Sequence, residues 1–227
     1  MPSRYTIKTF VENGYYHVYN RGVEKRKIFE DSQDYKVLLN YFKEALLPSP
    51  KLDDLKTIFT LQGTSFRGVR RLPKNFHQKV NLIAYCLMPN HFHLLLHQTE
   101  RENIEGFMRS VFTRYSTFFN KKYQRVGPLF QGIYKAAPIQ DDSYLLHLTR
   151  YVHQNPSEHN LDIKKAYSSY ADYLGLRNTK WIRPEVVLIF FKSQTLPLLK
   201  KYNDYRSFVE GYKKDSREIL GNLILED

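Results

Sequence analysis

Two histidines in one apolar segment are the residues of this chain best spaced for metal chemistry. The segment reads His91-Phe92-His93. In a β-strand, residues two apart point to the same face, so both imidazoles would project side by side and offer two nitrogen ligands. A pair of hydrogen-bonded sheet histidines would give the same pattern, and spacing alone leaves both interpretations open. His97 lies on the same face further along, where it could be mistaken for a further metal ligand.

A tyrosine and an asparagine form the second candidate set. Tyr151 and Asn155 are four residues apart, just before Pro156. On a helix this spacing stacks the two side chains on one face. A phenol beside an amide oxygen would suit a nucleophile next to a metal ligand. A core tyrosine followed by an asparagine that closes the helix is the competing interpretation.

The elements that must position these residues follow from hydrophobic spacing and breakers. Strands are expected over 14–22, 80–87, 91–98 and 133–139, with helices over 32–47 and 104–119 between them. This order predicts an α+β fold of the ferredoxin-like type, an antiparallel sheet with helices on one face. A further helix should begin near Asp141 and end at Asn155, because proline cannot continue it.

The rest of the chain is predicted less regularly. Residues 52–79 show no regular spacing of apolar residues, so we expect an exposed excursion from the domain there. Accessory helices are expected over 184–191 and 196–212. We expect a domain over residues 1–175, containing the ferredoxin-like core and the tyrosine-bearing helix, and a helical extension over 176–227.

Charge points to a polyanionic partner. The 227 residues carry a net charge of +12, and between Leu55 and Gln140 thirteen basic residues face only three acidic ones. Such a concentration attracts polyphosphate, and the many aromatic rings offer surfaces for unpaired bases. A single cysteine, Cys86, excludes an intramolecular disulfide framework. With neither a membrane-spanning stretch nor an apolar signal core, we expect a soluble cytoplasmic protein without a membrane partner.

Taken together, these motifs resemble a known family. His91-Phe92-His93 after Tyr85-Cys86-Leu87-Met88-Pro89-Asn90 resembles the HUH motif of single-tyrosine (IS200-like) transposases, and most closely that of REP-associated tyrosine transposases. That subgroup also places a tyrosine four residues before an Asn-Pro pair, as at Tyr151 and Asn155. Phe130-Gln131-Gly132 and Ser168-Ser169-Tyr170 fit its pattern too, and the resemblance extends over about residues 15–175.

The resemblance implies metal-dependent cleavage and rejoining of single-stranded, hairpin-forming DNA through a 5′-phosphotyrosine intermediate. His91, His93 and Asn155 would hold one Mg or Mn ion, and Tyr151 would attack the phosphate. His147, one turn earlier, is a candidate neighbour of the nucleophile. The resemblance also implies a nucleoid-associated protein that acts on REP-like hairpins as a monomer or a homodimer.

Several basic residues are candidate DNA contacts, and rival interpretations remain. The candidates are Arg21, Arg67, Arg70, Arg71, Lys74, Arg114, Lys121, Lys122, Arg125 and Lys135. Tyr115 is a rival nucleophile, although Phe119, four residues later, cannot bind a metal. A non-catalytic hairpin-binding DNA- or RNA-binding protein of the same fold is the main alternative function. A phosphoesterase would need a second histidine-containing strand motif, for which His17 alone is a poor match.

Overall fold

A four-stranded antiparallel sheet lies at the centre of this computed structural model, which describes residues 9–69, 71–193 and 196–211. The strand order is β4-β5-β1-β6, so the first strand of the chain is an inner strand. The strands are β1 (Tyr15–Arg21), β4 (Val80–Met88), β5 (His91–Gln98) and β6 (Lys135–Ile139). The last strand starts two residues later than expected, after Gly132 in a left-handed conformation (φ 70°).

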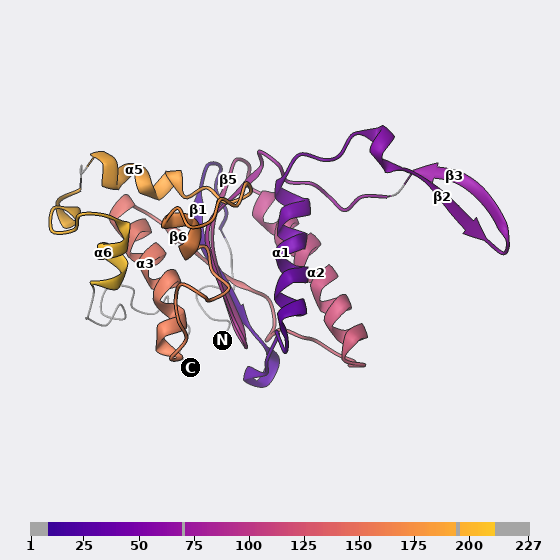
Figure 1. Ribbon diagram of the computed structural model, residues 1–227, viewed down its shortest axis with the longest axis horizontal. Coiled ribbons are helices and arrows are strands. Elements are labelled where there is room, and N and C mark those ends of the chain that lie inside the picture. Colours follow the sequence, from indigo (N-terminus) through magenta and orange to yellow (C-terminus); the bar gives the residue numbers. More distant parts are fainter. Residues whose placement is uncertain (1–8, 70, 194–195, 212–227) are drawn as a thin grey trace.

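Two helices, α1 (Ser32–Leu46) and α2 (Asn103–Lys122), cover one face of this sheet (Figure 1). The carboxylate of Asp31 caps α1 by accepting hydrogen bonds from the backbone N–H groups of Gln33 and Asp34. With its strand–helix–strand–strand–helix–strand order, the chain has the ferredoxin-like α+β fold that the sequence predicted.

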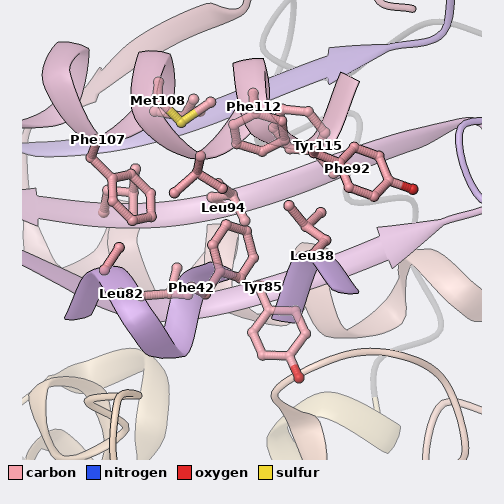
Figure 2. Packing of buried hydrophobic residues seen from close by; sticks show 14 of the residues in the cluster. Leu38, Phe42, Leu82, Tyr85, Phe92, Leu94, Phe107, Met108, Phe112 and Tyr115 are labelled. Atoms are coloured by element: carbon pink, nitrogen blue, oxygen red, sulfur yellow. The ribbon is translucent and has the colours of Figure 1, made fainter. Parts of the chain in front are cut away.

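The core between this helix pair and the sheet is rich in aromatic rings (Figure 2). Phe42 of α1 is fully buried, and its ring centroid lies 5.8 Å from that of Phe107 and 6.2 Å from that of Phe112 on α2. The strands contribute further buried side chains, among them Leu82, Phe92 and Leu94. Packing of these large side chains fixes the sheet on which the His91–His93 segment lies.

The opposite face of the sheet carries α3 (Asp142–Glu158), α4 (Tyr170–Tyr173), α5 (Glu185–Ser193) and α6 (Tyr205–Glu210) (Figure 1). A second buried cluster joins these helices to β4 and β5. Because both faces are covered, the side chains of β4 and β5 are buried nearly throughout instead of alternating between buried and exposed. Among the described residues, none of the helices has the length and apolar character that crossing a membrane requires.

The excursion expected over 52–79 is more ordered than predicted. After a 3₁₀ turn at Leu52–Leu55, it forms a hairpin of β2 (Lys56–Leu61) and β3 (Thr64–Val69) that projects from the body beyond α1 (Figure 1). Gln62 and Gly63 close it with positive φ angles of 49° and 83°, as in the turns that best fit a two-residue hairpin. Its sequence lacks a hydrophobic alternation because β3 is exposed along most of its length.

Two predicted helix boundaries are wrong. Helix α3 continues beyond Asn155 to Glu158 with Pro156 inside it; the proline removes one helical N–H, but its fixed φ is itself helical, so the helix passes through it. The single helix expected over 196–212 is instead a 3₁₀ turn at Pro197–Leu199 followed by α6, and residue 212 lies outside the described residues. Asp204 starts α6 with its own capping box, which explains the break.

Candidate active site

Strand β5 and helix α3 bring the four predicted site residues together. His91 Nε2 lies 3.0 Å from Asn155 Oδ1, and the ring centroids of His91 and His93 are 5.1 Å apart. The ring of Tyr151 stands edge-on to that of His93, with centroids separated by 5.3 Å and planes inclined by 81°. Two segments about sixty residues apart in the chain therefore meet at one place.

Local sequence explains how α3 presents its two side chains. Asp141 caps the helix through a hydrogen bond from the backbone N–H of Tyr144 to its carboxylate, 2.8 Å long. Leu145, Leu148 and Val152 are buried against the sheet, and this apolar contact sets the rotation of the helix. Tyr151 and Asn155, one turn apart, consequently face the histidines, and the two side chains are only 2% and 3% exposed.

The neighbouring strand β1 contributes a residue that sequence reasoning missed. His17 is fully buried, and its Nε2 lies 2.9 Å from His93 Nδ1. Burial lowers the pKa of His17 to about 3. Burial, together with the neighbouring His91 and His17, holds the pKa of His93 well below its usual value. Both imidazoles are therefore neutral at physiological pH, the form in which histidine binds metals.

The donor atoms of the site fit a divalent cation. His93 Nε2 is buried and has no hydrogen-bond partner among the described residues. His91 Nδ1 lies 2.6 Å from Asn90 Oδ1, and His91 Nε2 is at hydrogen-bond distance, 3.0 Å, from Asn155 Oδ1. The ring nitrogen of His91 and the amide oxygen of Asn155 are therefore close enough that both could bind one cation in place of this contact.

Nitrogen and amide oxygen donors make up this set. Groups of three or more His, Cys, Asp or Glu side chains able to hold a metal are absent from the described part of the chain. The candidate centre therefore depends on the amide of Asn155 as its third ligand. With no carboxylate in the set, a bound ion would keep its full positive charge for a phosphate.

The other two histidines named from the sequence have different partners. His147 Nδ1 lies 2.7 Å from the guanidinium of Arg150, and its ring faces Phe208 of α6 at 6.5 Å. Burial and the charge of Arg150 lower the pKa of His147. His97 Nδ1 lies 3.2 Å from Asn81 Nδ2, next to the ring of Tyr15.

Tyr115, the rival nucleophile, lies in the core on the other face of the sheet. It is fully buried on α2, and its hydroxyl donates a hydrogen bond to the backbone carbonyl of Ile28. Burial raises the pKa of Tyr115 far above its ordinary value. The structure therefore brings Tyr151, and not Tyr115, to the histidine pair.

Two of the candidate DNA-contacting cations share the sheet face of the histidines. Residues directly opposite each other in a sheet point to the same side. Arg21 pairs with His91, whereas Tyr19 pairs with His93 on one side and with Lys135 on the other. Arg21 Nε donates a hydrogen bond to Gln131 Oε1 (2.6 Å), and Lys135 Nζ lies 5.9 Å from the centroid of the Tyr19 ring.

The remaining candidate cations lie elsewhere. Arg67 is on β3, and Arg71 and Lys74 are on the segment leading back to β4, whereas Arg70 lies outside the described residues. On or just after α2, three cations have partners within the chain while Lys121 is exposed. Arg114 pairs with Glu44, Lys122 pairs with Asp31 and Asp34, and Arg125 donates to Asn120.

Comparison with known proteins bears directly on this site. Residues 72–155 match the family model described as "Transposase IS200 like". The chain is also similar to a solved structure of a REP-associated tyrosine transposase bound to a REP hairpin, with 13% identity over 77% of this chain and 88% of that chain and a TM-score of 0.49. No curated protein sequence matches it. The matched segment contains His91, His93, Tyr151 and Asn155, so the part of the chain that carries the candidate site is similar to the IS200-like transposases.

Proposed function

We propose that this chain is a metal-dependent transposase that cleaves and rejoins single-stranded DNA at hairpin-associated sites. The observation that carries the proposal is the meeting of a phenol, an amide oxygen and two neutral imidazoles at one place between β5 and α3. The match to the IS200-like family over the same segment supports it.

His91, His93 and Asn155 would hold one Mg or Mn ion through two ring nitrogens and one amide oxygen. When bound, such an ion supplies Lewis-acid chemistry, neutralising charge on a phosphate and orienting it for in-line attack. Oxygen donors from Asn155 and the DNA phosphate suit these hard cations. The His91 side chain is oriented from its other side by Asn90.

Tyr151 would act as the nucleophile. Its phenolic oxygen loses its proton to solvent and forms a bond to phosphorus, while the bond from phosphorus to the 3′ oxygen breaks. The leaving 3′ oxygen takes up a proton and becomes a free hydroxyl, and the 5′ phosphate remains on the tyrosine. One phosphate ester replaces another, so the reverse reaction joins strands without ATP.

Access to the site sets a condition on this chemistry. His91, Tyr151 and Asn155 are 4%, 2% and 3% exposed, too little for a DNA phosphate to reach them. DNA binding must therefore displace part of the cover, such as the end of α3, where the ring of His159 lies 5.9 Å from that of His91. Arg21 and Lys135, on the same sheet face, would attract the incoming strand.

One copy of the chain contains the whole residue set. Tyr151 and the histidine pair meet within the same molecule, an arrangement that supports cleavage in cis by a monomer. A homodimer is also compatible with the proposed chemistry, with each copy using its own complete site.

The proposal is tested by incubating the protein with labelled single-stranded hairpin DNA and Mn²⁺, with and without chelator, and separating products on denaturing gels. We expect a covalent protein–DNA adduct that needs the metal, disappears in Tyr151→Phe and persists in the matched variant Tyr115→Phe. Adducts that survive Tyr151→Phe would refute the assignment of the nucleophile. Hairpin binding without any adduct would instead support a non-catalytic DNA-binding protein.

A further inference from the structure

His17 is a buried histidine outside the proposed set of ligands and nucleophile. It lies in the middle of β1, opposite Leu95 of β5 and Ala137 of β6. Its ring stacks on that of His93, with centroids 5.1 Å apart and planes inclined by 20°. With apolar partners on both sides, this position would accommodate an apolar side chain.

A single hydrogen bond connects the two rings. His17 Nε2 and His93 Nδ1 are 2.9 Å apart, which is a hydrogen-bond distance between two ring nitrogens. A neutral imidazole has one N–H donor and one lone pair, so one of the two nitrogens donates and the other accepts. Two arrangements are therefore available, and they differ in what they leave on the far side of His93.

Only one arrangement is compatible with metal binding. If His93 Nδ1 donates to His17 Nε2, the lone pair of His93 is on Nε2, the buried atom without a hydrogen-bond partner. If His17 donates instead, His93 Nε2 carries a hydrogen and has no lone pair for a cation. Metal-binding histidines generally donate their second N–H to an acceptor that fixes tautomer and orientation.

We propose that His17 is a positioning residue, which accepts the hydrogen bond from His93 Nδ1 and so holds His93 Nε2 ready to bind the cation. The inference deepens the proposed function and rests on its metal site. His91 has a comparable support, since its Nδ1 lies 2.6 Å from Asn90 Oδ1. Each histidine of the pair thus has an outer partner, and the two partners come from different elements.

The unused nitrogen of His17 supports this role over simple packing. His17 Nδ1 is buried and makes no hydrogen bond with any described residue. Burying an unpaired polar atom is unfavourable, and an apolar side chain at this position would avoid it. A residue that weakens the fold in this way is expected where the site needs its chemistry.

Mn²⁺ binding to three variants tests the inference, measured by calorimetry on the otherwise metal-free protein. His17→Phe keeps a ring but removes the acceptor, and we expect Mn²⁺ affinity to fall roughly 10- to 100-fold. His17→Gln restores an acceptor oxygen and should recover most of that loss. His97→Phe, a matched change of a histidine on the same sheet face outside the pair, should bind Mn²⁺ like the unmodified protein.

A second measurement covers the case in which His17→Phe does not fold. Nitrogen-15 NMR of the unmodified, metal-free protein should show His93 protonated at Nδ1 and not at Nε2. Protonation at Nε2 would overturn the inference, as would unchanged Mn²⁺ affinity in folded His17→Phe or equal losses in folded His17→Phe and His17→Gln. Intact Mn²⁺ binding without any DNA adduct would refute the proposed function and leave the role of His17 standing.

Discussion

Mild acid should destabilise the fold through its buried histidines, and His153 allows the size of the effect to be worked out. This residue is fully buried on α3, with Nδ1 2.6 Å from the hydroxyl of Tyr205 and Nε2 2.7 Å from that of Ser169. Burial, with a smaller contribution from Arg177, lowers the pKa of His153 from 6.5 to about 3. Between these values the unfolded chain binds a proton that the folded chain does not.

The contribution of neutral His153 to the free energy of unfolding is therefore fully present above pH 6.5 and is lost progressively as the pH drops towards 3. One pKa unit corresponds to about 1.4 kcal/mol, and the unfolded histidine is half protonated at pH 6.5, so acidification from pH 6.5 to 4.5 should cost roughly 2 kcal/mol through His153 alone. His17, with its pKa also lowered to about 3, should add a similar loss. The sum is a large fraction of the 5–15 kcal/mol that stabilises a typical domain.

Urea unfolding of the metal-free protein at pH 7.5, 6.5, 5.5 and 4.5 measures this loss. Fluorescence of Trp181 is a suitable probe, because this single tryptophan packs against Tyr85 and Phe42 in the core. His153→Gln keeps polar atoms at the position but does not titrate, so between pH 6.5 and 4.5 its stability should fall by roughly 2 kcal/mol less than that of the unmodified protein. Parallel pH dependences for the two proteins would refute the reasoning, whatever their difference at pH 7.5.

Three further substitutions test separate parts of the structure. Phe42→Ala should lower the free energy of unfolding by about 3–5 kcal/mol, because the fully buried ring leaves a cavity between α1 and α2; a loss below ~1 kcal/mol in urea unfolding would contradict the packing described. Asn155→Ala should abolish the DNA adduct and weaken Mn²⁺ binding while hairpin binding persists, and an unchanged Mn²⁺ affinity would remove the amide from the ligand set. The double variant Arg67→Ala and Lys74→Ala should weaken DNA binding similarly for all sequences and reduce the slope of log affinity against log salt by roughly two if both residues contact duplex phosphates; an unchanged slope would show that this segment does not touch the backbone.

Local pattern predicted the elements that have a buried, periodic face. The strand at 91–98 and the stripe of α2 were recognisable because packing against the core selects their apolar positions. The β2–β3 hairpin was missed because it projects from the body and β3 is exposed along most of its length, so packing against the core does not select a regular apolar pattern there. The prediction ended helix α3 too early because it took Pro156 as a stop, whereas proline has a helical φ and its missing N–H removes only one hydrogen bond of the helix.

In the site, too, local spacing predicted the residues that lie close in sequence and missed a contact that depends on tertiary structure. His91 with His93, and Tyr151 with Asn155, are close in sequence, so strand and helix periods place each pair on one face. His17 reaches His93 only through the antiparallel register of β1 with β5, which no local pattern contains. Among the cations, the pairing of Lys122 with Asp31 and Asp34 likewise depends on how α2 packs beside α1.

Mapping the residue joined to DNA tests the central claim most directly. The protein is allowed to react with hairpin DNA and Mn²⁺, digested with protease and nuclease, and the nucleotide-bearing peptide is sequenced by mass spectrometry. The account predicts a 5′-phosphate attached to Tyr151 and no modified peptide when the metal is chelated. Attachment at another tyrosine, or no attachment under conditions where the hairpin is bound, would contradict it.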